Sequence, residues 1–346
     1  MILTYKIQHE RDFSEELKKA KQVAEFVIKT KSRSSKDVKH IGLKSVIANQ
    51  ILKKYANKKY KKVRSVKLTI PSQSIKVDKE KQIITIPCIK ASFQYFFPNK
   101  FTKINQIEVG EKNYYVSCTV QEEKEIKPES HIGVDLNTVG HCAVVGNPKT
   151  GKVLKLGKKQ KHIHNKYKNI RKQLQKKAKY KKVKQIKNRE SRIVRDLNHK
   201  ISRKIVNYAK ENKCGIKLEN LEGIRKNKKH NKTFKYALNS WSFYQLRTMI
   251  EYKSKILGIP VVMIAPQYTS QTCSKCGLLG KRTNKKFNCD SCGHVEHADV
   301  NASFNIALKS NSTVQLHKES VLCKGSTDTP KEAPYRKNTT SEPHEL

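Results

Sequence analysis

The stretch His131-Ile-Gly-Val-Asp-Leu-Asn137 decides the fold, because it reads as a buried strand that ends near an acidic residue, Asp135. Two more acidic residues stand at comparable places: Glu219 closes Gly215-Ile-Lys-Leu-Glu-Asn220, and Asp299 opens a short helical pattern. Carboxylates on rigid element ends suit a site for divalent metal ions. We therefore interpret these three residues as parts of one site, although they lie far apart in the sequence.

Each carboxylate also has a purely structural alternative. Asp135 could begin a turn, and Asp299 could cap a helix. Glu219 could be a surface residue, with Glu222 as its competitor for a functional role. The order of the three residues and the elements around them favour the joint site.

The charge of the chain indicates a polyanionic partner. Its 346 residues include 74 Lys and Arg but only 29 Asp and Glu, a net charge of +45. Such an excess opposes compaction unless a polyanion neutralises it, and nucleic acid is the abundant candidate. A merely solubilising surface would not need one sign of charge in such excess. A membrane-surface protein would need a long amphipathic helix with a wide apolar face, and we find none.

Localisation follows from the same composition. We find no signal peptide, and the longest apolar run, residues 259–265, is too short to span a bilayer. The scattered cysteines outside the paired motifs fit a reducing compartment. We expect a cytoplasmic protein without a membrane partner.

The first third of the chain predicts a β domain with a helical insertion. Residues 1–8 alternate as a strand, and residues 9–62 contain two amphipathic helical regions. Residues 63–128 return to short β-branched and aromatic runs separated by turn residues, typical of an antiparallel sheet or barrel. The predicted strands there are 66–70, 82–86, 91–96 and 114–120, and 123–130 reads as a linker.

The remainder predicts an RNase H-like α/β domain, because three adjacent strands are followed by helix, strand, helix, strand and helix. The helix over 242–257 opens with Ser242 and Gln245 at the spacing of a capping box. Residues 311–346 are polar, lack periodicity and are predicted to be disordered. The predicted elements are strands at 132–135, 141–145, 153–156, 215–219 and 261–264, a long basic helical region after 158, and a last helix at 299–308.

Two cysteine pairs predict a zinc ribbon. Cys273-Ser-Lys-Cys276 and Cys289-Asp-Ser-Cys292 supply four thiolates for tetrahedral Zn²⁺, with a small hairpin between the pairs. Four thiolates leave no open coordination position, so the zinc would be structural. Two disulfides are the alternative, which a reducing compartment disfavours.

Two basic segments are candidates for phosphate contacts. Residues 158–204 combine many Lys and Arg with an apolar stripe near the end, so that one face can pack while another follows a backbone. The loop 225–235 lies just beyond Glu219, and a solvent-exposed loop without such a role is its alternative. The candidate nucleic-acid contacts are Lys158, Lys159, Arg171, Lys172, Arg225, Lys226 and Lys228.

At these motifs the chain resembles the TnpB (OrfB) family of insertion-sequence proteins, which is related to type V CRISPR effectors. The resemblance is specific over about residues 130–310 and architectural only before that. The segments that carry it are Gly133-Val-Asp-Leu-Asn-Thr-Val-Gly-His141, Ile216-Lys-Leu-Glu-Asn-Leu221, Asn239-Ser-Trp-Ser-Phe-Tyr-Gln-Leu246, Tyr268-Thr-Ser-Gln-Thr-Cys-Ser-Lys-Cys-Gly277 and Cys292-Gly-His-Val-Glu-His-Ala-Asp-Val-Asn-Ala302.

The resemblance implies an α+β multidomain protein. A β-barrel wedge domain (1–8 and 63–128) would carry an inserted helical recognition lobe (9–62). An RNase H-like (RuvC) α/β nuclease domain (129–268 and 296–310) would carry an inserted zinc ribbon (269–295). The metal triad carries over to Asp135, Glu219 and Asp299, holding two catalytic Mg²⁺ ions, and the zinc ligands carry over to the four cysteines.

The implied activity is RNA-guided, Mg²⁺-dependent cutting of double-stranded DNA next to a short target-adjacent motif, with a guide RNA from the transposon right end. Cutting of the vacated donor site would aid retention of the element. The resemblance further implies a prokaryotic protein, a monomer in a ribonucleoprotein complex, associated with the nucleoid when it acts on DNA.

The chain departs from many relatives at two positions, with Ala298 in place of Arg and Asn137 in place of Gly, and neither removes a metal ligand. Two other functions stay open at this point. One is an RNA-guided DNA-binding regulator that does not cut. The other is a transposase or an unguided RuvC-type nuclease.

Overall fold

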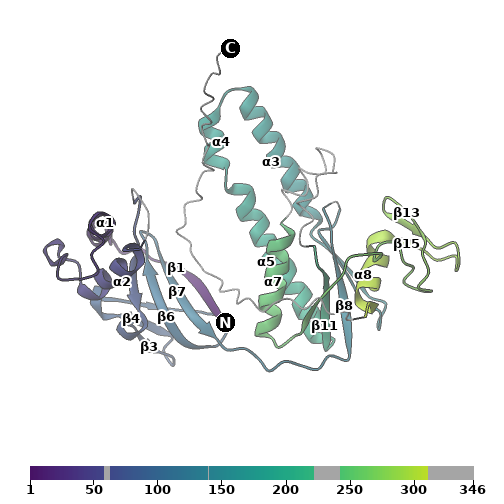
Figure 1. Ribbon diagram of the computed structural model, residues 1–346, viewed down its shortest axis with the longest axis horizontal. Coiled ribbons are helices and arrows are strands. Elements are labelled where there is room, and N and C mark those ends of the chain that lie inside the picture. Colours follow the sequence, from purple (N-terminus) through teal and green to yellow (C-terminus); the bar gives the residue numbers. More distant parts are fainter. Residues whose placement is uncertain (58–62, 139, 222–241, 311–346) are drawn as a thin grey trace, which may run out of the picture. The chain divides into compact units, whose positions relative to one another are not determined.

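The computed structural model describes residues 1–57, 63–138, 140–221 and 242–310, and these residues form two compact units. Of the described residues, one unit comprises those within 2–120, and the other comprises residue 1 with those within 121–310. Figure 1 shows the elements of both units along the chain. None of the helices described is long and apolar enough to cross a membrane.

The first unit contains two antiparallel sheets. Strand burial alternates along β1 and β7, as expected of a sheet with one face on a core. The four-stranded sheet has the order β1 (Ile2–Gln8), β7 (Asn113–Val120), β6 (Phe101–Val109), β2 (Leu68–Pro71), and the three-stranded sheet has the order β3 (Lys76–Asp78), β4 (Ile83–Ile86), β5 (Ala91–Gln94).

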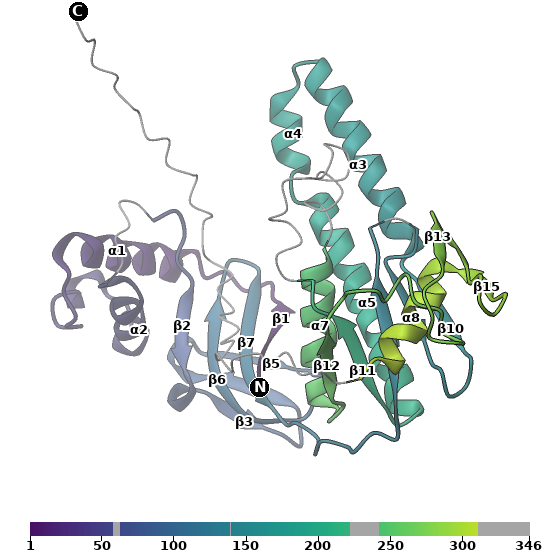
Figure 2. The same cartoon turned by 45° about the vertical axis from the view of Figure 1, so that its right-hand side comes forward.

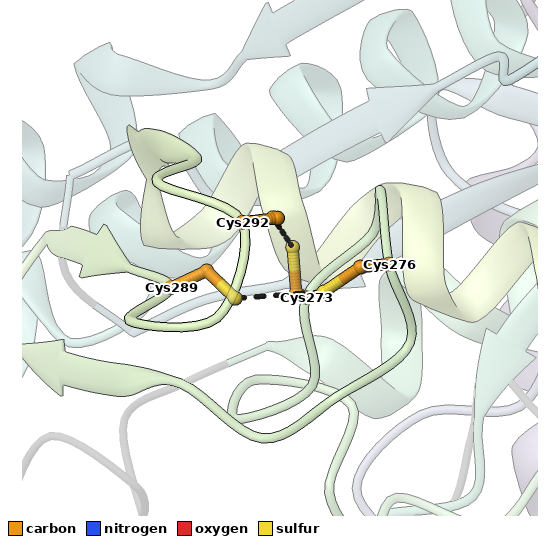
Figure 3. Close-up of side chains that lie close together, drawn as sticks. All are labelled: Cys273, Cys276, Cys289 and Cys292. Carbon is orange, nitrogen blue, oxygen red and sulfur yellow. Dashed lines mark hydrogen bonds between the residues drawn. The ribbon is translucent and has the colours of Figure 1, made fainter.

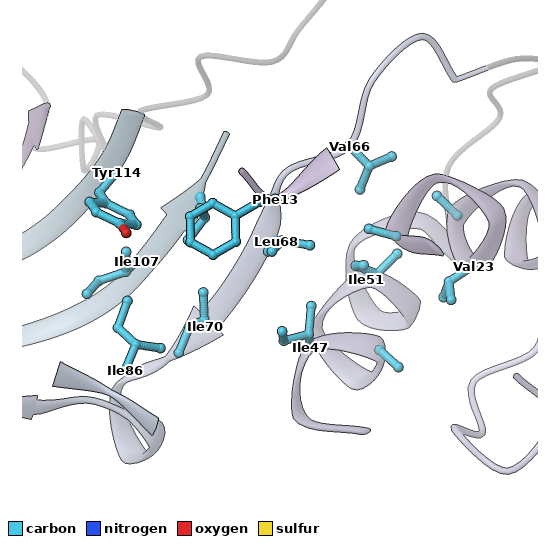
Figure 4. Close-up of a cluster of buried hydrophobic side chains, with 14 of the residues drawn as sticks. Phe13, Val23, Ile47, Ile51, Val66, Leu68, Ile70, Ile86, Ile107 and Tyr114 are labelled. Atoms are coloured by element: carbon cyan, nitrogen blue, oxygen red, sulfur yellow. The ribbon is translucent and has the colours of Figure 1, made fainter. Parts of the chain in front are cut away.

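Two helices stand between β1 and β2 in the chain, as the sequence predicts. They are α1 (Ser14–Thr30) and α2 (Ser45–Tyr55), and short 3₁₀ helices cover Lys39–Ile41, Ser72–Ser74 and Pro87–Ile89. Their apolar faces belong to the same core as the strands: Val23, Ile47 and Ile51 lie in one cluster with Leu68 and Ile107 (Figure 4). The helical insertion is therefore stabilised by the sheet it interrupts.

The second unit is built on a five-stranded mixed sheet. β8 pairs antiparallel with β9 and parallel with β11, and β11 pairs parallel with β12. β8 and β11 are buried almost throughout, as expected of strands covered on both faces. The order across the sheet is β10 (Val153–Leu156), β9 (Ala143–Gly146), β8 (Ser130–Leu136), β11 (Cys214–Glu219), β12 (Val261–Ile264).

Helices cover the two faces of this sheet. α5 (Arg189–Glu211) and α7 (Phe243–Ile256) share a core with the sheet, whereas α8 (Ala298–Leu308) packs on β8 and β9. The basic segment forms α3 (Lys158–Lys176), α4 (Tyr180–Ile186) and the start of α5, a helical arm that extends away from the sheet in both views (Figure 2).

The predicted capping box at the start of α7 is wrong. Ser242 is the N-cap residue, but no side chain caps the helix. Instead, Nδ2 of Asn198 on α5 donates hydrogen bonds to the Ser242 hydroxyl at 3.0 Å and to the side-chain oxygen Oε1 of Gln245 at 2.9 Å. Asn198 is fully buried and must satisfy its amide, so the tertiary contact wins over the local cap.

A small three-stranded sheet precedes α8. It consists of β13 (Lys281–Thr283), β14 (Lys286–Asn288) and β15 (Val295–His297), all antiparallel. β15 leads directly into α8. The cysteine-rich segment is therefore joined to the helix that carries Asp299.

Candidate active site and metal centre

Strand periodicity places two of the predicted carboxylates on one face of the five-stranded sheet. Successive side chains of a strand point to opposite faces. In β8, Ile132 and Val134 lie in the core shared with α5 and α7, so Asp135 points to the other face, toward α8. Leu218 of β11 belongs to the same core and pairs with Val134, which places the next residue, Glu219, beside Asp135.

Two glycines let α8 lie directly on that face. Gly133 and Gly146 pair across β8 and β9. A Cβ atom at Gly133 would lie 2.0 Å from the carbonyl oxygen of Ser303, and one at Gly146 would lie 2.5 Å from the Ser303 hydroxyl. The absence of side chains thus brings α8 against the sheet, with Asp299 in the first turn of the helix.

Asp135 is a buried carboxyl group with a strongly raised pKa. Burial, followed by the negative charges of Glu219 and Asp299, raises its pKa to about 7. Nδ2 of Asn137 donates a hydrogen bond to Asp135 Oδ2 at 2.8 Å, which acts in the opposite direction. The side chain is 8% exposed. Asp135 therefore interacts electrostatically with both of the other carboxylates.

Glu219 is held by a residue that the sequence did not single out. Oγ1 of Thr269 donates to Glu219 Oε1 at 2.5 Å. Burial raises the pKa of Glu219, and this hydrogen bond partly offsets the rise. Thr269 follows β12, the neighbour of β11 in the sheet, so only the fold brings it to Glu219.

Asp299 is buried and paired with cations. It is 2% exposed, and its backbone N–H donates to Nδ1 of His297, the N-cap residue of α8, at 3.3 Å. Nζ of Lys285 lies 2.6 Å from Oδ2 and 2.8 Å from Oδ1 of Asp299, and Arg282 lies 3.5 Å away. Sequence analysis did not identify Lys285 as a partner of Asp299, because only the folded hairpin brings the two residues together.

The three carboxylates form a looser group than the four cysteines. In the part of the chain that is described, the four cysteines are the only group of three or more His, Cys, Asp or Glu residues whose ligand atoms all lie within 4.8 Å of one another. The ligand oxygens of Asp135, Glu219 and Asp299 do not all lie that close to one another. Carboxylate oxygens suit Mg²⁺, which retains waters, and Asp135 interacts with both other carboxylates.

The four predicted cysteines form a compact cluster (Figure 3). The Sγ atoms of Cys273 and Cys292 are 3.7 Å apart, and those of Cys276 and Cys289 are 3.5 Å apart. Tetrahedral ligands at the usual zinc–sulfur distance would be separated by roughly 3.8 Å. All four are free cysteines, so the alternative of two disulfides is wrong. The cluster could hold a metal ion such as zinc.

The candidate nucleic-acid contacts on α3 differ in exposure and in their partners. Lys158, Lys159 and Lys172 are exposed on α3, whereas Arg171 donates to Glu190 at 2.6 Å and so joins α3 to α5. Their contact with nucleic acid stays a prediction. Glu222, the loop candidates Arg225, Lys226 and Lys228, and the polar tail lie outside the described residues.

Comparison with known proteins places this architecture in a class. A family model described as "Cas12f1-like, TNB domain" matches residues 243–306. The cryo-EM structure of a Cas12f1-sgRNA-target DNA complex contains a chain with a TM-score of 0.58 and 18% identity, covering 85% of this chain and 82% of that chain. The fold is thus similar to that of the chain in the Cas12f1 complex, and residues 243–306, which contain the four cysteines, match the Cas12f1-like TNB domain.

Sequence relatives give the family. The TnpB-like protein MJ0751 of Methanocaldococcus jannaschii is 32% identical over 247 residues, which cover 66% of this chain and 88% of that protein. The chain belongs to the TnpB-like family, and the resemblance predicted from its motifs is confirmed. The CRISPR-associated endodeoxyribonuclease Cas12f1 of Sulfoacidibacillus thermotolerans is 42% identical over 115 residues, but the match spans only 26% of its length.

Proposed function

We propose that the chain is an RNA-guided, Mg²⁺-dependent DNA endonuclease encoded by a transposable element. The observation that carries the proposal is the convergence of Asp135, Glu219 and Asp299 on one face of the sheet, from three distant segments. Its partners would be a guide RNA from the right end of the element and double-stranded target DNA. The name of the Cas12f1 relative and the contents of the Cas12f1 complex support this proposal.

Asp135, Glu219 and Asp299 would together hold the Mg²⁺ ions, with Asp135 placed between the other two carboxylates in its electrostatic interactions. When bound, such ions supply activation of water and stabilisation of the leaving oxyanion. The chain itself contributes orientation: Asn137 holds Asp135 and Thr269 holds Glu219 through the hydrogen bonds described above. Burial and then the neighbouring carboxylates raise the pKa of Asp135, and a divalent cation bound there would favour its charged form.

The finer architecture is part of the proposal. The sheet order β10-β9-β8-β11-β12, with one antiparallel meander and two parallel neighbours, supports the RNase H-like assignment of residues 129–268 and 296–310. The two sheets around one core in the first unit support a wedge domain of barrel type with a helical lobe at 9–62. One structural zinc ion would hold the ribbon at 269–295.

The nucleic-acid contacts are proposed from charge and position. The exposed lysines of α3 would follow phosphates, while the ion pair of Arg171 with Glu190 keeps the arm rigid. Protein would recognise duplex geometry and a short target-adjacent motif, and base pairing would read the target. We propose a monomer in a ribonucleoprotein complex, acting on DNA in a prokaryotic cytoplasm.

The test is reprogrammed cutting. RNA that copurifies with the full chain is sequenced, its guide segment is changed, and plasmids carrying matched or unmatched targets are incubated with wild type and Asp135→Ala. We expect cutting of the matched plasmid by wild type alone. Cutting that ignores the guide would support an unguided nuclease, and guided binding without cutting by wild type would support a regulator. Equal cutting by the variant would refute the assigned site.

A further inference from the structure

The hairpin turn of the ribbon is fixed against the first residue of α8. Thr283 pairs with Lys286 across β13 and β14, so the two residues between them, Asn284 and Lys285, form the turn. The carbonyl oxygen of Lys285 accepts a hydrogen bond from the N–H of Ala298 at 2.8 Å. The backbone therefore sets the position of Lys285 relative to Asp299, one residue further along α8.

The ammonium group of Lys285 contacts both carboxylate oxygens of Asp299. The distances are 2.6 and 2.8 Å, and the amide oxygen of Asn137 lies 3.5 Å from the same nitrogen. Asp299 is 2% exposed, whereas the Lys285 side chain is 37% exposed. A buried carboxylate without a counter-charge is strongly unfavourable, and Lys285, with the more distant Arg282 at 3.5 Å, supplies the compensation from the solvent side.

The same contact excludes another cation from those oxygens. A divalent ion needs carboxylate lone pairs, and an ammonium at hydrogen-bond distance from both oxygens competes for them. We infer that Lys285 is an internal counter-cation that must leave Asp299 before a divalent ion can bind there. This inference rests on the proposed metal site.

The surroundings suggest what moves Lys285. The side chain of Lys285 is partly exposed, so a change of its rotamer can move the ammonium group toward solvent without unfolding the ribbon. A nucleic-acid phosphate near the site would attract it, and Asp299 would then be free for the ion. Metal binding and occupancy by the strand to be cut would thereby favour each other, as linkage requires.

The experiment compares Lys285→Met with Lys286→Met, an adjacent exposed lysine whose loss changes the net charge equally. Binding of Mn²⁺, as a probe for the carboxylate site, is measured by electron paramagnetic resonance on the full, zinc-loaded chain. We expect Lys285→Met to bind Mn²⁺ roughly threefold tighter or more, because apparent affinity scales with the fraction of molecules in the competent state. Lys286→Met and Lys285→Arg should bind like wild type.

Thermal melting provides a second measurement. If Lys285→Met loses stability without metal, Mn²⁺ should raise its melting temperature more than that of wild type, because a tighter ligand stabilises more. Equal Mn²⁺ affinity and equal metal-induced shifts for Lys285→Met and wild type would overturn the inference.

The two proposals fail in distinguishable ways. If Asp135→Asn bound Mn²⁺ as wild type does, the carboxylate site would be refuted, and the role of Lys285 with it. If the Lys285 variants behaved as expected but cutting ignored the guide, only the RNA-guided function would fail.

Discussion

Substitution of Gly133 by Ala should disrupt the site without touching any candidate ligand. The added Cβ would lie 2.0 Å from the Ser303 carbonyl oxygen and 2.5 Å from the Ala307 nitrogen, both backbone atoms of α8. Since ordinary contact begins near 3.4 Å, the helix would have to move by about 1.4 Å. Overpacking typically costs about 1–3 kcal/mol, and a clash with backbone should reach or exceed the upper value.

The displacement should also reach the chemistry, because Asp299 is one turn from Ser303 on the same helix. A misplacement of about 1 Å can reduce turnover roughly 100-fold. Urea denaturation followed by circular dichroism measures the free energy of unfolding, and guided plasmid cutting measures activity.

Gly110→Ala is the matched control. Its new Cβ would meet the nearest atom, on the Tyr115 ring, at 3.6 Å, and the effect on stability should stay within about 1 kcal/mol. If Gly133→Ala unfolded at the same urea concentration as this control and cut DNA at the wild-type rate, the packing argument for the position of Asp299 would be refuted.

The other predictions concern the ribbon, a buried lysine and the basic arm. Cys289→Ser should lower the zinc content, measured by metal analysis, and the melting temperature, measured by calorimetry, because loss of a ligand weakens the metal binding that stabilises the fold. The control Cys88→Ser should change neither quantity. Burial lowers the pKa of Lys253 from 10.5 to about 8 in the folded chain. Between about pH 8 and pH 10.5 the unfolded chain therefore binds more protons than the folded chain, and the free energy of unfolding should rise with pH. Lys253→Met should flatten that rise in urea titrations, and an unchanged pH profile would contradict the assignment. Lys158→Gln with Lys159→Gln should reduce the logarithmic salt dependence of DNA binding by about 0.9 per lost phosphate contact, measured by fluorescence anisotropy.

The strands with simple burial patterns could be predicted from sequence. β10 and β12 have the predicted bounds, Val153–Leu156 and Val261–Ile264, because each is a short apolar run between turn residues. β6, at Phe101–Val109, was not predicted. Its pairing with β7 has register shifts after Phe101 and Ile104, which break the period-two alternation on which strand prediction depends.

Some residues of the candidate site could likewise be selected from the sequence, whereas others could not. The spacing of the four cysteines predicts their cluster, and Asp135 could be selected as a candidate because it lies near the end of a predicted buried strand. Thr269 and Lys285 act only through contacts made by the folded chain. The capping box failed for a related reason, since Asn198 takes both oxygens that would have served a local cap.

The three carboxylates enter the protein at widely separated moments of its synthesis, with Asp299 the last to emerge from the ribosome. A nascent chain that has completed β8 and β11 still lacks the helix that covers their acidic ends. The basic arm, α3 to α5, precedes β11 in the chain and is already made at that point. The proposed metal site can therefore form only after this last helix has been synthesised and has packed on the sheet.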